Sequence, residues 1–324
     1  MGEWLKQLER QSPKLRLEQL CGCGYWKQLF QSCIPDQQLD EHYGVGNTHA
    51  FLLYGPEGVG KRTLALACAG TWGDAGYRFL VFPRQSELEN EERGIQQIVT
   101  EIFQEIIKEL RSSENGYFLL IEDIHWMIKE KKTAEIFKEK IQEMEEENLL
   151  FTVIGILEHI EEMDDSVKKY FLPCRLENPD QEERRIYLEN VFEGRIPRSN
   201  GLSYSFMVEK TEGFLYQQMS DLSRLAGMLL KQKALQLYGN RRTELTEAWN
   251  RGTVCLTKDL FLAMVKQLEN VSGKQPIGLM KKEEQEIPTL QISNQEEQNS
   301  GLLTDQAEDT DFMKDLLDMD LEDF

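Results

Sequence analysis

The sequence predicts an α/β fold, in which a parallel β-sheet is flanked by helices and is followed by an all-helical region and a disordered acidic tail. Short apolar runs alternate with helical periods over residues 47–177, and this alternation is typical of a parallel sheet wrapped by helices. Residues 178–270 carry helical patterns only, and residues 271–324 are polar and acidic. Residues 1–46 form an N-terminal helical and linker segment.

The composition is that of a globular protein with one large or two ordinary domains. The chain has 324 residues, 40% of them apolar, and a net charge of −20. This acidity argues against binding to nucleic acid, because the mean field repels polyanions. No apolar run reaches the roughly 18 residues of a membrane span, and the N-terminus lacks the apolar core of a signal peptide. We therefore expect a cytoplasmic protein with reduced cysteines.

The elements of residues 1–177 follow from the spacing of apolar residues. A short amphipathic piece at the N-terminus contains Trp4, Leu5 and Leu8. Continuous apolar runs predict strands that are buried on both faces, at 50–54, 77–82, 117–121 and 149–156. Helical periodicity predicts the helices between these strands, at 63–70, 94–111 and 127–147.

A glycine-rich segment, Gly-Pro-Glu-Gly-Val-Gly-Lys at 55–61, follows the first of these strands and opens a helix. This is the context of a phosphate-binding P-loop, where glycines let backbone N–H groups point at phosphate oxygens and the helix N-terminus adds positive charge. Lys61 would contact the β- and γ-phosphates. The sequence therefore predicts a P-loop NTPase sheet that binds ATP with Mg²⁺. The predicted nucleotide-binding residues are Gly55, Pro56, Glu57, Gly58, Val59, Gly60, Lys61, Arg62, Thr63 and Leu64.

One position departs from the P-loop pattern. The residue after the lysine is normally Ser or Thr, whose hydroxyl ligates Mg²⁺, but here it is Arg62, with Thr63 one step later. Three alternatives are open: Thr63 takes the position, water fills the site, or the metal binds weakly. Nucleotide binding should survive this change better than hydrolysis does.

Two carboxylates, Glu122 and Asp123, end the strand predicted at 117–121. This arrangement is that of a Walker B motif, and the alternative is a solvated loop. We predict that Glu122 holds the metal and that Asp123 orients and deprotonates the attacking water, with Lys61 as the third catalytic residue. The usual order is Asp then Glu, so the base here is one methylene shorter, and slow hydrolysis is expected.

At these motifs the sequence resembles the AAA+ ATPases, over about residues 42–268. The P-loop strand is the most specific part of the resemblance, and several weaker stretches agree with it in order and spacing. The P-loop strand is 51–61, and the weaker stretches are 86–88, 163–164, 171, 179–186, 211–214, 221–222 and 256–264.

The resemblance implies an α/β core with a small helical lid, with the nucleotide held where they meet, and usually a homo-oligomeric ring. Glu158 matches the position of the polar sensor residue, and Lys168 and Lys169 match the arginine-finger positions that act on a neighbouring subunit. The function implied is that of a slow, chaperone-like ATPase, an acid anhydride hydrolase that remodels or assembles a protein complex. The alternative is a nucleotide-occupied switch or adaptor with little hydrolysis.

A second resemblance covers the P-loop alone. Residues 49–65 are also similar to the P-loop of bacterial clamp-loader subunits, which gives a minor alternative, a clamp-loader-like subunit in DNA replication. Those subunits carry a four-cysteine zinc module and a Ser-Arg-Cys motif, and this sequence has neither.

The end of the chain combines charge with large apolar residues. Residues 301–324 contain nine acids and one lysine, interleaved with Phe, Met and Leu. A purely solubilising tail needs no large apolar residues. We therefore predict that 310–324 docks on a protein partner with an apolar groove and a basic rim.

Overall fold

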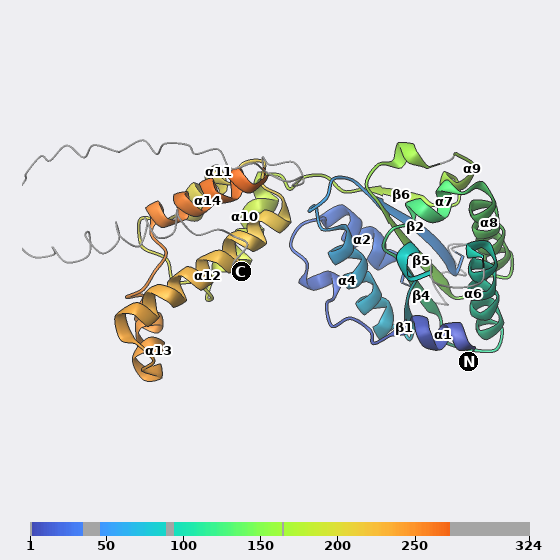
Figure 1. The fold of residues 1–324 in the computed structure, drawn as a ribbon, viewed down its shortest axis with the longest axis horizontal. Helices are drawn as coiled ribbons and strands as arrows, with labels where there is room; N and C mark the ends of the chain where they lie inside the picture. Colours follow the sequence, from blue (N-terminus) through green and yellow to red (C-terminus); the bar gives the residue numbers. More distant parts are fainter. Residues whose placement is uncertain (1, 35–45, 89–93, 164, 273–324) are drawn as a thin grey trace, which may run out of the picture. The chain divides into compact units, whose positions relative to one another are not determined.

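The computed structural model describes residues 2–34, 46–88, 94–163 and 165–272 (Figure 1). The acidic tail from residue 273, with the predicted docking segment at 310–324, lies outside the described residues. The chain divides into two compact units. The first runs to Tyr187 and includes Gly213–Gln217, and the second comprises Leu188–Glu212 and the chain from Gln218 onward.

The first unit contains a six-stranded sheet with the strand order β1-β3-β4-β5-β2-β6. Every neighbouring pair is parallel except β1 with β3. The predicted α/β class with a parallel sheet is therefore confirmed. The strands span Glu9–Arg10 (β1), Thr48–Tyr54 (β2), Arg78–Val81 (β3), Tyr117–Ile121 (β4), Phe151–Leu157 (β5) and Leu172–Arg175 (β6).

The four strands expected from apolar runs are β2, β3, β4 and β5, and they form the middle of the sheet. The two edge strands were not expected from the sequence. β1 has two polar residues, and β6 contains Pro173 and an exposed leucine, Leu172. Both are too short or too polar to form an apolar run, and proline is tolerated in β6 because that strand lies at the edge of the sheet.

Helices cover both faces of the sheet (Figure 1). Successive residues of β4 alternate between two apolar clusters: Leu119 and Ile121 join one, and Phe118 and Leu120 join the other. The first cluster takes in α1, α6, α7 and α8, and the second takes in α2 and α4. The helices span Glu3–Leu8 (α1), Gly24–Ser32 (α2), Lys61–Asp74 (α4), Gln85–Leu88 (α5), Ile95–Leu110 (α6), His125–Lys129 (α7), Lys131–Glu146 (α8) and Asp165–Lys168 (α9), with 3₁₀ turns at Leu17–Gln19 and Ile160–Glu162.

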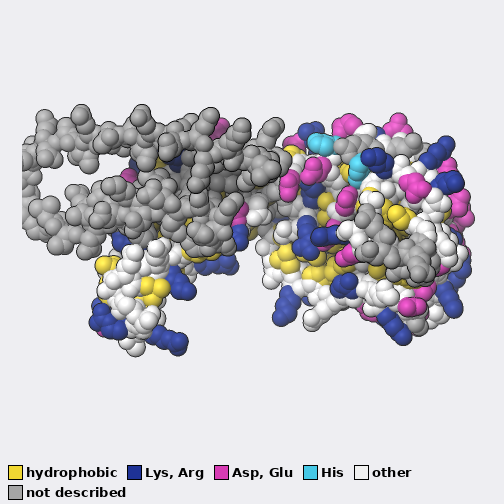
Figure 2. Space-filling view, viewed as in Figure 1, with side chains coloured by type: hydrophobic (Ala, Val, Ile, Leu, Met, Phe, Trp, Pro, Cys, Tyr) yellow, Lys and Arg dark blue, Asp and Glu magenta, His cyan; other side chains and the backbone are white. Residues whose placement is uncertain are grey.

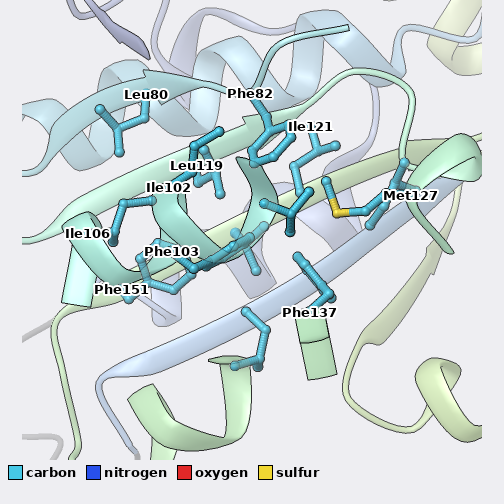
Figure 3. Close-up of a cluster of buried hydrophobic side chains, with 14 of the residues drawn as sticks. Leu80, Phe82, Ile102, Phe103, Ile106, Leu119, Ile121, Met127, Phe137 and Phe151 are labelled. Carbon is cyan, nitrogen blue, oxygen red and sulfur yellow. The ribbon is translucent and has the colours of Figure 1, made fainter. Parts of the chain in front are cut away.

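Aromatic rings fill the centre of the first cluster, part of which is drawn in Figure 3. Phe137 contacts Phe103 edge to face at 5.4 Å between ring centroids and stacks on Phe171 at 5.6 Å. The apolar stripe that predicted one helix over 127–147 is buried as expected. The helix itself is divided, because Glu130 has an extended backbone between α7 and α8.

The second unit contains helices and, among its described residues, no strand. Basic side chains gather at α13, where Arg241, Arg242 and Arg251 lie (Figure 2). Within the described ranges, no helix combines the length and apolar character needed to cross a membrane. The helices span Gln181–Phe192 (α10), Tyr204–Lys210 (α11), Tyr216–Tyr238 (α12), Arg242–Arg251 (α13) and Lys258–Ser272 (α14), with α10 and α12 starting in the first unit.

Candidate nucleotide site

The predicted site residues lie together at the carboxyl ends of the central strands, because β2, β4 and β5 are parallel. The loop at 55–60 follows β2, Glu122 and Asp123 follow β4, and Glu158 follows β5. The backbone N–H of Gly55 donates to the carbonyl of Glu158 at 3.2 Å. The start of the loop is thus fixed to the neighbouring strand end.

The shape of the loop depends on glycine. Gly55, Gly58 and Gly60 have φ values of +137°, +82° and +92°, in the region that side chains disfavour. A Cβ at Gly55 would also lie 2.1 Å from the backbone oxygen of Leu176, so no other residue fits there. Val59 is fully buried and anchors the loop in the core under α4.

Lys61, the first residue of α4, is 8% exposed. Its Nζ donates to the carbonyl oxygens of Gly55 at 2.6 Å and of Pro56 at 2.7 Å, so the ammonium lies across the loop. Burial lowers the pKa of Lys61, against the opposing effect of the carboxylates of Glu158 and Glu57. Phosphate oxygens entering the loop can replace the two neutral carbonyls with stronger, charge-assisted acceptors.

Glu122 is held between two arginines. Its Oε1 accepts from Nε of Arg62 at 2.6 Å, and its Oε2 accepts from Nη2 of Arg84, also at 2.6 Å. The Glu122 side chain is 13% exposed, and the arginines are 63% and 66% exposed. Burial raises the pKa of Glu122, but the hydrogen bonds from Arg84 and Arg62 outweigh burial and leave the pKa below its ordinary value.

Asp123 and Thr63 are both exposed. Oδ1 of Asp123 accepts from the backbone N–H of His125 at 3.2 Å, which ties the carboxylate to the start of α7. Thr63 is the third residue of α4. Among the described residues, no group of three or more His, Cys, Asp or Glu side chains is arranged to hold a metal.

Magnesium does not fit the arrangement around Glu122. Mg²⁺ requires oxygen ligands in near-octahedral geometry, and both oxygens of Glu122 are bonded to guanidinium groups. The P-loop position that normally supplies a hydroxyl supplies one of these guanidiniums, from Arg62. The predicted Glu122 and Thr63 metal site is therefore not preformed in this structure.

The two lysines expected at the arginine-finger positions make local contacts. Nζ of Lys168 pairs with Oδ1 of Asp165 at 3.0 Å, and the ammonium of Lys169 lies 5.2 Å from the ring centre of Tyr170. Glu158 is the one candidate sensor residue that the structure connects to the loop, through its backbone and through its effect on Lys61.

Arg84 was not identified from the sequence. It lies just beyond the carboxyl end of β3, which neighbours β4 in the sheet. Its place at the same end of the sheet as Glu122 is the signal by which it could have been found. Lone arginines after strands are common, and the pairing becomes evident only once the strand order is known.

A second group that sequence analysis missed surrounds the loop. The backbone N–H of Gln217 donates to the carbonyl of Gly58 at 3.3 Å. Tyr216 lies against Gly60, and its hydroxyl reaches Gly22. Burial and the carboxylate of Glu183 raise the pKa of Tyr216. These residues come from three distant parts of the chain, and no local motif links them.

Comparison with known proteins agrees with the α/β fold of the first unit. Residues 51–172 match the family model described as "ATPase family associated with various cellular activities (AAA)". Among solved structures, one from work on the structural basis of katanin self-assembly has a TM-score of 0.59 and 18% sequence identity, covering 82% of this chain and 89% of that chain. At this identity the likeness shows the fold. No curated protein matches the sequence.

Proposed function

We propose that this chain, which carries an AAA-family ATPase domain at residues 51–172, binds ATP at its P-loop and hydrolyses it slowly, so that nucleotide occupancy acts mainly as a switch. The phosphate-binding elements support binding: left-handed glycines, a helix N-terminus and a buried lysine at one loop.

The proposal of slow turnover rests on the hydrogen bonds that the carboxylates of Glu122 and Asp123 already make. Glu122 is bonded to two guanidiniums, and Asp123 accepts from a backbone N–H. A general base must lie within hydrogen-bond reach of the water that it deprotonates. The Asp123 carboxylate can do so only if it breaks its hydrogen bond to the backbone N–H of His125 or accepts from both groups. Asp123 is also shorter than the glutamate that usually stands there.

Phosphate release at saturating ATP tests turnover. We expect a rate below about 1 s⁻¹, the lower end of typical enzymes, and a further loss of about tenfold or more in Asp123→Ala, since general-base catalysis contributes at least that much. Glu145→Ala, an exposed glutamate on α8, is the control and should match the wild type. Equal rates in the wild type and Asp123→Ala would remove the enzymatic part of the proposal and leave the switch.

The proposal extends to self-assembly and to a protein partner. The katanin structure concerns self-assembly, and here Leu172 is 45% exposed on the edge strand β6, close in sequence to Lys168 and Lys169. The charged and apolar residues of 310–324 are suited to partner binding. Remodelling or assembly of a protein complex would follow from a switch that changes partner affinity.

Native mass measurement with and without ATP tests assembly. We expect a shift from monomer to a larger homo-oligomer when ATP is added, and no shift in Lys61→Ala. A monomer under both conditions, at micromolar concentration, would contradict self-assembly and leave nucleotide binding unaffected.

A further inference from the structure

The cluster formed by Arg62, Glu122 and Arg84 (the arginine bridge) stands where a P-loop site normally holds its divalent cation. Arg62 directly follows the P-loop lysine, at the position whose hydroxyl ligates Mg²⁺. Glu122 holds the carboxylate position that would face the same ion, and both its oxygens receive guanidinium hydrogen bonds at 2.6 Å.

The charges of the arginine bridge match those of a metal site. Two guanidiniums and one carboxylate leave a net charge of +1, the same as one Mg²⁺ beside one carboxylate. An arginine keeps its charge at any physiological pH and offers a planar set of donors that matches phosphate oxygens. A lysine or a water could not supply both properties.

The arginine bridge is also accessible. The arginine side chains are 63% and 66% exposed, although the carboxylate between them is 13% exposed. All three residues line a cavity of about 480 Å³, together with Arg10 and an apolar wall that includes Phe79 and Phe82, whereas the loop at 55–61 does not line this cavity. Because each guanidinium has five N–H donors and both arginine side chains are largely exposed, each can keep its bond to Glu122 and still offer other N–H groups to a phosphate.

We propose that the arginine bridge replaces the divalent cation, so that this chain binds nucleoside triphosphates without Mg²⁺. The inference depends on the proposed function, because it assumes that the triphosphate binds at the P-loop. Arg62 is then a specificity-determining residue: it neutralises the β- and γ-phosphate charge that Mg²⁺ would otherwise neutralise.

Calorimetric titration with the non-hydrolysable analogue AMPPNP, in excess EDTA and in excess Mg²⁺, tests the inference on the full chain. We expect wild-type dissociation constants within about threefold of each other. In Arg62→Thr, which restores the hydroxyl, we expect affinity in EDTA to fall by about tenfold or more, as befits a lost charge-assisted bond, and Mg²⁺ to recover most of it.

Arg111→Thr is the matched control. Arg111 is also a half-exposed arginine that pairs with two glutamates, Glu143 and Glu147, but its ion pairs join α6 to α8. This variant should behave as the wild type in both buffers. Thermal unfolding of each variant confirms that the titrated protein is folded.

Glu122→Gln gives a second, independent arm. If Glu122 only positions the arginines, loss of its negative charge should leave the affinity in EDTA unchanged or raise it. If Glu122 instead serves a metal, the variant should weaken binding in Mg²⁺ by about tenfold.

The outcomes are distinguishable. A wild type that loses about tenfold or more of its affinity in EDTA overturns the arginine bridge but leaves the proposed function standing. A wild type that shows no binding heat in either buffer overturns the proposed function itself.

Discussion

Lys61→Ala is expected to weaken ATP binding by about 100-fold or more, the largest effect of any single substitution on function. The Nζ of Lys61 lies across the loop, bonded to two backbone carbonyls, and would exchange them for phosphate oxygens. Each charge-assisted hydrogen bond is worth roughly 1.5–3 kcal/mol, so two such bonds account for a loss of this size. Calorimetric titration with AMPPNP measures it.

The control for this substitution is Lys129→Ala, an exposed lysine at the end of α7, which should leave the affinity unchanged. Burial lowers the pKa of Lys61 from its ordinary value of 10.5, whereas a bound phosphate would raise it again. Wild-type affinity for the nucleotide should therefore be highest at neutral pH. It should fall as the pH rises through the lowered pKa that Lys61 has in the unbound protein. A Lys61→Ala protein that binds within threefold of the wild type would contradict the assignment of the loop.

The parts of this fold that could be predicted from sequence are those with local causes. The glycines at 55, 58 and 60 each take a positive φ, and their spacing between a predicted strand and a predicted helix, with Lys61 after them, predicts a phosphate-binding loop. The central strands are buried on both faces, so they form continuous apolar runs. β6 could not be found in this way, because Leu172-Pro-Cys-Arg175 forms a strand only through its pairing with β2.

The functional state of the acidic pair could not be predicted because it depends on tertiary contacts. Arg62 was recognised as a departure from the P-loop pattern, and Glu122 as a metal ligand, but each was considered alone. They are 60 residues apart in sequence, and Arg84 lies between them, 38 residues before Glu122. The strand order β3-β4-β5-β2 brings the carboxyl ends of β3, β4 and β2 to the same end of the sheet, and only then do Arg62, Arg84 and Glu122 become one charged cluster.

Trp72→Ala is expected to lower the free energy of unfolding by about 3–5 kcal/mol, in the range for a large buried aromatic side chain. Trp72 lies near the end of α4, is fully buried, and meets the ring of Phe118 at 5.9 Å between centroids. Its Nε1 donates to Oγ1 of Thr152, a fully buried hydroxyl on β5, at 3.0 Å. Urea unfolding, monitored by circular dichroism, measures the change.

The hydrogen bond can be separated from the packing by a double-mutant cycle. Thr152→Val leaves the indole N–H buried without its acceptor, and Trp72→Phe leaves the hydroxyl without its donor, at a cost of about 1–3 kcal/mol for each unsatisfied group. The double variant removes both groups, so it should be less destabilised than the sum of the two single variants. Strict additivity would show that the bond between α4 and β5 contributes nothing.

The same variants test whether α4 transmits core damage to the candidate site. Lys61 and Trp72 lie at opposite ends of α4, about 16 Å apart at 1.5 Å rise per residue. The loop is fixed by its own contacts, through Gly55 to Glu158 and through Val59 to the core. AMPPNP affinity of Trp72→Ala, measured well below its unfolding midpoint, should therefore stay within about threefold of the wild type. A loss as large as that of Lys61→Ala would mean that the packing of α4 on the sheet, rather than the loop itself, sets the position of the lysine.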